Sequence, residues 1–480
     1  MCSFFLRDTV RRVKRPFGPK GSWLLGNLRE VQRDTIGFLH RSAAQYGPDI
    51  QYYQIAFWNV YRLSHPDYNR HILQDNQRNY GKSTLDYDVL RRLSGNGLIS
   101  NQGESWLQQR RLLQPLFHRR RIAALGDIMV QATADLLPRW HTLAQNKTVF
   151  DVNEAMTELT LDIVARALFS LDVRQNGRLF SEAFHEVNEY FGSLDPVFAV
   201  APWLPMPRIR RFYRNLGVMN QFIYDIIARR RQQPQTGDQV DLLTLLLEAR
   251  DEETGAGMDD VQIRDELITL LIAGHETTAN LLAWTWYLLA QHPAARERLD
   301  EELAGVSLPS VKANGRLPTV ADIPNLPFTE QLLKEALRLY PPAWFISRNA
   351  IDDDEIGGYP IPASSLVSVS TYLTHRHPDF WPQPDQFDPD RFTPAAEAAR
   401  PRYAYLPFGG GPRLCIGNSF AMTEATLILA TLAQQFRLTL ATSHPVTPDP
   451  LITLRVKGGL QVIAQPIAAP VTGTKSQIQG

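Results

Sequence analysis

The chain has 480 residues, with 50 basic and 50 acidic side chains and 44% hydrophobic residues. This balance is ordinary for a globular protein and lacks the basic excess that nucleic-acid binders usually carry, so nucleic acid is not expected as a partner. The only two cysteines, Cys2 and Cys415, exclude a disulfide framework, favour a reducing compartment, and leave no C-x-x-C-H or zinc-ribbon pattern.

The start of the chain shows no membrane anchor or export signal. The apolar run Cys2–Leu6 is far shorter than the roughly 20 residues that span a bilayer. It is also shorter than the apolar core of a secretory signal, which needs about 7 residues. Phe4, Phe5 and the basic cluster Arg11–Arg15 could make a weak contact with a membrane surface, but we favour a solvated, flexible segment over residues 1–15. We therefore expect a cytoplasmic protein without a transmembrane anchor.

The first half of the chain is predicted to be mainly helical after a short β part. Pro16–Gly26 is rich in Pro and Gly and predicts a rigid turn. The aromatic and β-branched run Ile50–Leu63 predicts a pair of strands. Helical periodicity dominates from Pro66 to Ala304. Its clearest stretches are Gln102–Phe117, Val152–Phe169, Ser181–Phe191, Arg208–Arg231 and Asp241–Arg250.

The longest helical pattern covers Asp260–Gln291, and His292-Pro293 ends it. Its centre, Leu267–Trp286, is apolar nearly all round, which indicates a helix buried in the protein core. The polar pair His275-Glu276 interrupts this run and argues against a membrane span. The pair also begins like the zinc motif H-E-x-x-H, but residue 279 is Ala, so the second histidine ligand is missing.

The segment Ala273–Thr278 in the middle of this helix combines small and polar residues. Glycine inside a helix lowers helix stability by about 1 kcal/mol relative to alanine, so the presence of Gly274 suggests a functional role. A bulge at this point would free backbone groups for water. The alternative is that Thr277 and Thr278 only bond back to carbonyl groups within the helix.

The last third of the chain is predicted to combine two helices with short strands. The helices cover Phe328–Tyr340 and Ser419–Gln435, and the strands lie near Trp344–Ala350, Leu366–Ser370 and Ile452–Ala464. The polar tail over residues 466–480 is predicted to be disordered. Together the patterns predict a fold that is mainly α with a small β region, in a single domain over residues 16–465.

A glycine-rich loop, Phe408–Gly417 (FGGGPRLCIG), leads to Cys415 just before the last predicted helix. A helix N-terminus lowers the pKa of a thiol because its free N–H groups and its dipole favour the anion, and the thiolate is the form that binds metal. Glycine allows tight turns and a close approach of the backbone to a flat cofactor. Arg413 could pair with a carboxylate of that cofactor. The alternative is a glycine-rich turn around a buried, inert cysteine.

Five motifs resemble those of the cytochrome P450 family, and they occur in that family's order. They are W-x-x-x-R at Trp106–Arg110, A-G-x-[DE]-T-T at Ala273–Thr278, E-x-x-R at Glu335–Arg338, the Pro-rich segment Phe387–Phe392, and F-x-x-G-x-R-x-C-x-G at Phe408–Gly417. The likeness extends from Pro16 to Gln465. It implies the family's fold, an α-rich triangular prism around a buried haem, and a soluble bacterial-type member without a fused reductase.

The resemblance implies haem b (iron protoporphyrin IX) as the cofactor, with Cys415 as the axial ligand of the iron. Thiolate ligation favours cleavage of the O–O bond of dioxygen. Further cofactor contacts implied by the motifs are Phe408, Gly411, Arg413 and Gly417 in the cysteine loop, Trp106, Arg110 and Arg348 at the haem propionates, and Ala273 and Gly274 beside the oxygen site. For Arg110 the alternative is a solvated face, since Arg111 and Arg119–Arg121 are also basic.

The same resemblance assigns chemistry to the central helix and a structural role to three charged residues. Thr277 would supply a hydroxyl that hydrogen-bonds the activated oxygen, and Glu276 would relay protons through water. Glu335 and Arg338 stand three apart on one helix face. They would join Arg391 in a buried charged triad that serves folding and haem retention.

Stretches that match the family's substrate-contact regions are nearly all apolar. Their residues are Leu98, Ile99, Leu270, Ala273, Phe345, Ile346 and Ile452. An apolar pocket suits a hydrophobic substrate, and the motifs LYPPAWFISR and FDPDRF favour a fatty acid, terpenoid or other lipid. For each of these residues, the alternative is that its side chain only packs in the hydrophobic core. The segment Ser193–Arg211, apolar and then basic, lies where the family has a mobile entrance lid.

The implied reaction inserts one atom of O2 into a C–H or C=C bond. No flavin segment and no cysteines for an Fe–S cluster are seen, so the two electrons would come from a separate ferredoxin with its reductase, or from a flavodoxin-type donor. We expect a monomer. Two alternatives stay open: a peroxide-driven hydroxylase or isomerase-like member without a reductase, and a non-catalytic haem-binding sensor or carrier.

Overall fold

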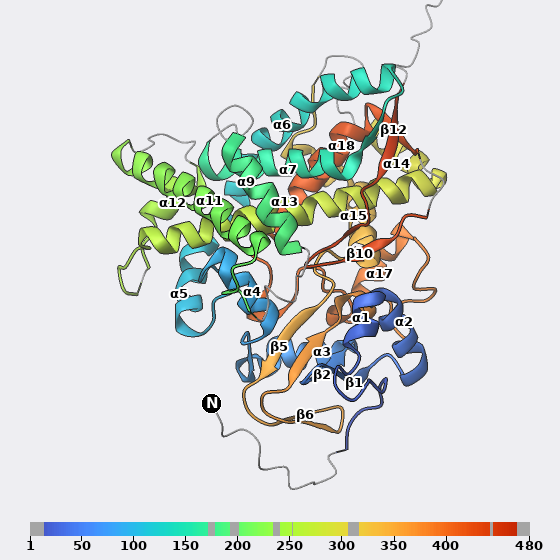
Figure 1. Cartoon of the computed structure of the whole chain (residues 1–480). Coiled ribbons are helices and arrows are strands. Elements are labelled where there is room, and N and C mark those ends of the chain that lie inside the picture. Colours follow the sequence, from blue (N-terminus) through green and yellow to red (C-terminus); the bar gives the residue numbers. More distant parts are fainter. Residues whose placement is uncertain are drawn as a thin grey trace, which may run out of the picture. The chain divides into compact units, whose positions relative to one another are not determined.

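A computed structural model describes residues 14–170, 178–192, 201–233, 241–251, 253–305, 316–441 and 445–467 of the chain (Figure 1). The chain forms two compact units, and each unit gathers segments that are far apart in the sequence. Unit 1 consists of Met1–Val89, Ala343–Gln386 and Ala399–Cys415, and unit 2 of Leu90–Pro342, Phe387–Ala398 and Ile416–Gly480. Most of the predicted N-terminal segment and of the predicted tail lies outside the described residues, and the single domain over residues 16–465 stays a prediction.

Unit 1 is built on a five-stranded sheet with the strand order β1-β2-β8-β5-β3. The strands β1 (Ile50–Ile55) and β2 (Trp58–Leu63) form the antiparallel pair that the aromatic and β-branched run predicts. Beside them, β8 (Leu366–Val369) pairs in parallel with β2, β5 (Ile346–Ala350) pairs antiparallel with β8, and β3 (Tyr80–Gly81) forms the edge. The sheet therefore joins the start of the chain to a segment near residue 350, and apolar side chains from both segments form its core.

The rest of unit 1 consists of short elements. They are α1 (Leu28–Arg33), α2 (Thr35–Tyr46), α3 (Pro66–Arg70), a π-helical turn η1 (His71–Asp75), 3-10 turns at Gln77–Asn79, Arg402–Ala404 and Gly411–Arg413, the hairpin of β6 (Asp354–Ile356) with β7 (Tyr359–Ile361), and α16 (Thr371–Thr374). Asp34 fixes the start of α2, because its carboxylate accepts a hydrogen bond from the Gly37 N–H at 2.9 Å. The turn η1 matters below because it supports the cysteine loop.

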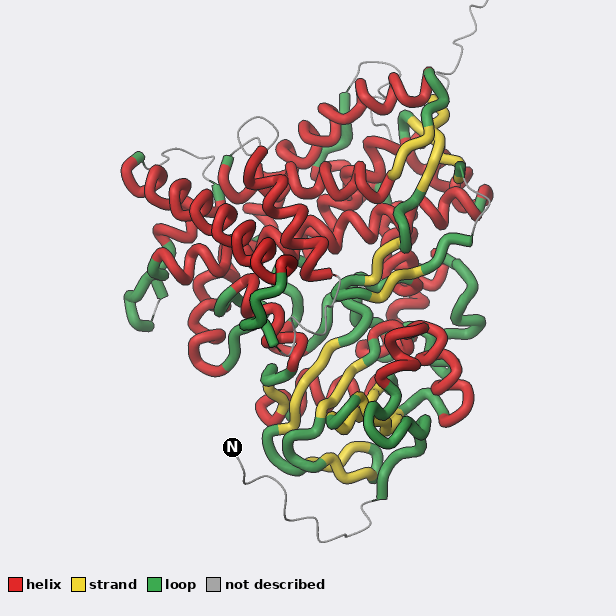
Figure 2. Tube along the Cα trace, in the orientation of Figure 1, coloured by secondary structure: helices red, strands yellow, loops and turns green. Residues whose placement is uncertain are grey.

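Unit 2 is mainly helical, and its longest helix is α13 (Asp260–Gln291) (Figure 2). Asp259 caps the start of α13 by accepting a hydrogen bond from the Gln262 N–H at 2.7 Å. The next helix, α14 (Pro293–Gly305), begins with the proline that ends the predicted helical run. The helix α7 (Val152–Phe169) packs along α13.

The remaining elements of unit 2 are helices and two small sheets. The helix α4 (Leu85–Ser94) starts in unit 1 and ends in unit 2. The other helices are α5 (Gly103–Leu113), α6 (Arg119–Gln145), α9 (Arg178–Gly192), α11 (Pro207–Gln232), α12 (Leu242–Glu248), α15 (Pro327–Leu339), α17 (Pro394–Ala399) and α18 (Asn418–Ala433), with 3-10 turns at Gln114–Phe117, Val320–Asn325 and Pro389–Phe392. The sheets are β4 (Val149–Asp151), β12 (Gln461–Pro466) and β9 (Phe436–Leu440), and the pair β10 (Pro448–Pro450) with β11 (Leu454–Val456).

The predicted fold class, mainly α with a small β region, is confirmed. The helices α7 and α13 have the predicted bounds. The predicted strand region Ile452–Ala464 contains two strands, because Gly458 and Gly459, with φ of +73° and +80°, turn the chain between β11 and β12. At Gly274 the helix α13 has no π-bulge, since it is α-helical at every residue. In the described part of the chain, no helix is long and apolar enough to cross a membrane.

Candidate functional site

The cysteine loop of unit 1 has a backbone that requires glycine. Gly409 and Gly411 have φ of +73° and +63°, in the left-handed region that side chains disfavour. A Cβ on Gly411 would lie 1.8 Å from the Leu73 carbonyl oxygen of η1. A Cβ on Gly410 would lie 2.6 Å from the ring of Tyr403. The glycine run therefore lets the loop lie directly against two parts of unit 1.

Backbone and side-chain hydrogen bonds hold this loop in place. The Cys415 N–H donates to the Phe408 carbonyl at 2.9 Å and closes the loop. Before the loop, the Leu406 N–H donates to Nε2 of the buried His375 at 2.9 Å. The Tyr403 hydroxyl donates to Gln74 Oε1 at 2.7 Å. Leu73, Tyr403 and His375 could not be predicted from the sequence, because their link to the loop is made only by the fold.

Cys415 is exposed at the end of the loop, so a ligand can reach its thiol. This finding contradicts the alternative of a buried, inert cysteine. In chain order Gly417 caps α18, which begins at Asn418, so the cysteine precedes a helix as expected. Among the described residues, no three side chains of His, Cys, Asp or Glu are grouped to hold a metal by themselves.

Arg348 of unit 1 is a buried cation that is held without a carboxylate. It lies on β5 and is 6% exposed. Its guanidinium donates to the Tyr87 hydroxyl at 3.1 Å and to the Ser347 carbonyl at 2.7 Å. In the described part of the chain no Asp or Glu forms an ion pair with it. A buried guanidinium of this kind suits a ligand that brings its own carboxylate.

The helix α13 of unit 2 carries an accessible face among buried residues. Leu270, Ala273, Gly274 and Thr277 are half-buried, while most neighbours on the helix are fully buried. Their spacing of three and four residues places them on one side of the helix. The Thr277 hydroxyl donates to the Ala273 carbonyl at 2.7 Å, so the predicted back-bonding within the helix does occur. The hydroxyl oxygen keeps its capacity to accept a hydrogen bond.

Gly274 has a packing role that the sequence did not reveal. A Cβ at this position would lie 3.0 Å from Val164 Cγ2 of α7. Nearby, the Thr160 hydroxyl of α7 donates to the His275 carbonyl at 2.8 Å. The missing side chain therefore lets α7 approach α13 closely, and this packing explains a glycine in mid-helix without reference to a ligand.

Glu276 is hydrogen-bonded to Thr453, a residue far from it in the sequence. The Thr453 hydroxyl donates to Glu276 Oε1, and Asn280 Nδ2 donates to Thr453 Oγ1 at 3.1 Å. Thr453 directly follows Ile452, the half-buried residue that was predicted to contact substrate. Thr453 was not predicted from the sequence; the only local signal was the four-residue spacing of Glu276 and Asn280.

The other predicted residues of unit 2 lie on α5 and in the loop before it. Trp106 is buried and Arg110 is half-buried, four residues apart on α5. Leu98 is buried, and its N–H donates to Glu266 Oε2 at 3.0 Å, while Ile99 is half-buried. Burial raises the pKa of Glu266 to about 8. This acid, which fixes the loop to α13, was not identified from the sequence.

The remaining residues that were predicted to contact substrate lie in unit 1. In unit 1, Phe345 and Ile346 are half-buried, and Ile346 Cδ1 lies 3.6 Å from where a Cβ on Gly409 would stand. Ile346 thus lies against the cysteine loop. Of the expected lid Ser193–Arg211, residues 193–200 lie outside the described residues, and Pro207 begins α11.

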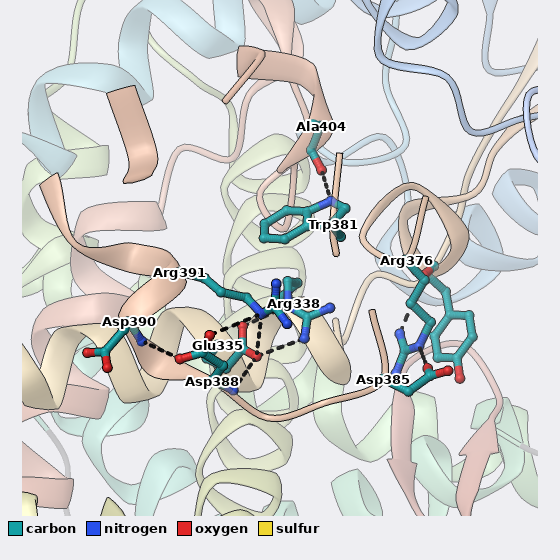
Figure 3. A network of polar contacts seen from close by, with 10 residues as sticks. Glu335, Arg338, Arg376, Trp381, Asp385, Asp388, Asp390, Arg391 and Ala404 are labelled. Carbon is teal, nitrogen blue, oxygen red and sulfur yellow. Dashed lines mark hydrogen bonds and ion pairs between the residues drawn. The ribbon is translucent and has the colours of Figure 1, made fainter. Parts of the chain in front are cut away.

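Glu335, Arg338 and Arg391 meet in the interior of unit 2 (Figure 3). Both side chains of the Glu335–Arg338 pair are fully buried, with Nε 2.7 Å from Oε2. Arg391 Nε lies 3.7 Å from Glu335 Oε1, and the Asp388 N–H donates to the same oxygen at 2.9 Å. Burial raises the pKa of Glu335, and the two guanidinium groups oppose that rise. The carboxylate therefore joins α15 to the Pro-rich segment.

Glu424 on α18 is a further buried acid of unit 2. It is fully buried, and neither carboxyl oxygen makes a hydrogen bond of good geometry in the described part of the chain. Burial raises its pKa to about 8, and the nearby Thr278 hydroxyl opposes that rise. Glu424 is therefore neutral in the folded protein at pH 7, whereas the same group in the unfolded chain has its ordinary pKa of 4.5 and is ionised.

We expect Glu424→Gln to stabilise the protein at neutral pH but not at acidic pH. Because the folded pKa is raised, unfolding releases a proton between pH 4.5 and about 8, and the stability from the neutral acid is lost as pH rises through that window. Glutamine does not ionise, so the gain at pH 7 has an upper bound of about 3 kcal/mol. Melting temperatures at pH 4 and pH 7 check this; a difference between variant and wild type that is the same at both values contradicts the assignment.

The predicted residues thus fall into two sets, one in each unit. Unit 1 holds Phe408, Gly411, Arg413, Cys415, Phe345, Ile346 and Arg348, and unit 2 holds Leu98, Ile99, Trp106, Arg110, Leu270, Ala273, Gly274, Glu276, Thr277, Glu335, Arg338, Arg391, Gly417 and Ile452. Within unit 1 the structure brings Ile346 to the cysteine loop. Within unit 2 it brings together the three charged residues at Glu335.

Comparisons with known proteins show which family the chain is similar to. The family model described as Cytochrome P450 matches residues 16–462. Cyclooctatin synthase of Streptomyces melanosporofaciens is 36% identical over 96% of this chain and 97% of its own length. Pentalenene oxygenase of Streptomyces avermitilis is 34% identical over 90% of this chain and 93% of its own length. Among solved structures, the cytochrome P450DA heme domain superposes with a TM-score of 0.85 at 27% identity, covering 96% of this chain and 99% of that chain.

Proposed function

Because the chain belongs to the cytochrome P450 family, we propose that it is a haem-thiolate monooxygenase acting on a hydrophobic terpenoid or related lipid. One atom of dioxygen enters a C–H or C=C bond of the substrate, and the other leaves as water with two protons and two electrons. The observation that carries the proposal is the exposed thiol of Cys415, which ends a loop whose backbone requires glycine at Gly411.

The residues present fit a haem, for which we propose haem b. Cys415 offers a single accessible thiolate, and Arg348 offers a buried guanidinium without an acidic partner in the described part of the chain. When bound, the haem supplies the redox-active iron that activates dioxygen. In this proposal Arg348 binds a propionate, and Trp106 and Arg110 are further propionate contacts. Phe408, Gly411, Arg413 and Gly417 shape the loop around the thiolate.

Protons reach the oxygen site through α13 in this proposal. Thr277 lies on the accessible face of the helix and can accept and donate a hydrogen bond at one oxygen. Glu276 is the neighbouring acid, and it is held by Thr453 through one carboxyl oxygen only. A hydroxyl beside an acid can pass protons inward while the rest of the helix excludes water.

We expect Thr277→Ala to keep the uptake of electrons and dioxygen but to lose product. Removing a group that takes part in proton transfer costs typically about 100-fold or more in the step it serves. The reducing equivalents should then appear as peroxide or excess water. The ratio of product to NADH consumed measures this, and Thr277→Ser, which restores the hydroxyl, should recover the ratio. A Thr277→Ala variant with wild-type coupling would remove the residue from the mechanism.

The substrate class rests on the apolar residues and on the relatives. Leu270 and Ala273 are apolar members of the accessible face of α13, and Ile346 lies against the cysteine loop. Pentalenene oxygenase is named for an unsaturated hydrocarbon. Together these observations favour a cyclic terpenoid over the fatty acids that the sequence motifs also allow.

A ligand screen by absorbance tests the substrate class. Hydrophobic ligands that displace water from the iron shift the Soret band of the haem. We expect cyclic terpenes to give such a shift, fatty acids a weaker one, and polar aromatic compounds none. If polar aromatics shift the band while terpenes and fatty acids leave it unchanged, the proposed substrate class is wrong.

The electron donor in this proposal is a separate ferredoxin with its reductase, or a flavodoxin-type protein. Product formation that requires such a system, with dioxygen, excludes the two alternatives of a peroxide-driven enzyme and a haem-binding sensor. Turnover with hydrogen peroxide alone would favour the first alternative, and haem binding without turnover would favour the second. The monomeric state and the cytoplasmic location stay predictions.

A further inference from the structure

Residues along one stripe of α13 form hydrogen bonds with the segment Thr453–Leu454. The stripe consists of Glu276, Asn280 and Trp284, which are spaced by four residues and so share one side of the helix. Glu276 Oε1 accepts from the Thr453 hydroxyl, Asn280 Nδ2 donates to Thr453 Oγ1 at 3.1 Å, and Trp284 Nε1 donates to the Leu454 carbonyl at 3.2 Å. Thus Glu276, Asn280 and Trp284 all hydrogen-bond to two adjacent residues, Thr453 and Leu454.

The direction of these hydrogen bonds fixes the Thr453 proton. Asn280 donates to the Thr453 oxygen, so the single hydroxyl proton of Thr453 is left to point at Glu276. Asn280 is 2% exposed and Thr453 is 8% exposed, and a hydrogen-bond chain in such surroundings is stronger than one in water. Within the described residues the second carboxyl oxygen of Glu276 accepts no hydrogen bond, so it stays available for a proton.

The loop itself is anchored, so Thr453 has a defined position. The Leu454 N–H donates to the Pro342 carbonyl at 3.0 Å. The Trp284 ring that binds Leu454 stacks on Tyr340 with centroids 3.8 Å apart and planes 6° apart. Hydrogen bonds at both its N–H and its carbonyl therefore hold Leu454, the residue that directly follows Thr453.

We propose that Thr453 is a positioning residue for the acid of the oxygen-activating helix, with Asn280 setting the direction of its proton. Thr453 holds one oxygen of Glu276 and leaves the other free to exchange protons. This inference rests on the proposed monooxygenase function. Thr453 directly follows Ile452, which is expected to contact the substrate. The same segment therefore contacts the substrate and orients Glu276, so that substrate binding is linked to proton transfer.

The test compares Thr453→Val, which removes the hydroxyl at nearly constant shape, with Thr453→Ser, which keeps it. The haem-containing protein is used throughout. Infrared difference spectra against Glu276→Gln identify the carboxyl band of Glu276 without any turnover. In Thr453→Val this band should shift, and in Thr453→Ser it should return. With pentalenene as probe substrate and a surrogate ferredoxin system, product formed per NADH should fall about tenfold in Thr453→Val, the loss expected for one hydrogen bond to a charged group.

Thr285→Val is the matched control. Thr285 is buried on the same helix, and its hydroxyl donates to the Leu281 carbonyl at 2.7 Å, away from Glu276. It should leave both the band and the coupling unchanged. If Thr453→Val does not retain haem, Asn280→Leu provides the second test and should shift the same band. An unmoved Glu276 band in a folded Thr453→Val protein overturns the inference, whereas a wild-type protein without haem or turnover overturns the proposed function instead.

Discussion

Cys415→Ala is expected to abolish monooxygenase activity and to remove the thiolate signature from the haem spectrum. Alanine offers no electron pair to the iron. The loop should still form, because its geometry depends on Gly409, Gly411 and backbone hydrogen bonds. The measurement is the absorbance of the purified variant with its haem content and turnover.

Cys2→Ala is the control for this experiment, since Cys2 is the other cysteine of the chain. It should keep the spectrum and the activity of the wild type. A Cys415→Ala protein with the same spectrum and turnover as the wild type would show that sulfur at this position does not hold the iron. Loss of both properties in Cys2→Ala would show that the effect is not specific to the loop.

Glu335→Gln is expected to give the second large effect, a loss of folded, haem-retaining protein. The substitution leaves Arg338, which is fully buried, without the carboxylate that neutralises it. It also weakens the contacts of Glu335 to Arg391 and to the Asp388 N–H. Stranding one charge of a buried pair costs about 3–5 kcal/mol, a large part of the stability of an ordinary domain. The melting temperature and the haem retained after gel filtration measure the loss.

Glu330→Gln on the same helix is the matched control. Glu330 pairs with Lys334 at 2.9 Å, but its side chain is 49% exposed. An exposed pair contributes at most about 1 kcal/mol, so this variant should melt close to the wild type. If both substitutions lower the melting temperature equally, burial is not what makes the contacts of Glu335 important.

The sequence predicted those parts of the fold and site that depend on neighbouring residues. The bounds of α13 follow from the cap at Asp259, a long apolar run and the stop at His292-Pro293, which are all local signals. The cysteine loop was recognised from the pattern F-x-x-G-x-R-x-C-x-G, and its glycines at 409 and 411 adopt a backbone that other residues disfavour. Such requirements are visible in a short stretch of residues.

Contacts between distant segments could not be predicted. In the parallel pairing of β2 with β8, Val60 lies opposite Leu366. The hydrophobic pattern of either strand does not indicate which other strand it pairs with. For the same reason Thr453 was missed as the partner of Glu276, and Leu73 as the backbone group behind Gly411. The packing of Gly274 against Val164 was also missed, while its predicted place beside the oxygen site stays a prediction. Each of these facts requires knowledge of which segments the fold places side by side.

The carbonyl complex of the reduced wild-type protein tests the central claim most directly. A thiolate from Cys415 would push electron density onto the iron, which a neutral imidazole would do to a lesser degree, so the two ligands would give carbonyl bands at different wavelengths. We predict the band of a thiolate-ligated haem, in a protein purified with one haem per chain. Protein without porphyrin, or a carbonyl band typical of histidine ligation, would contradict the account.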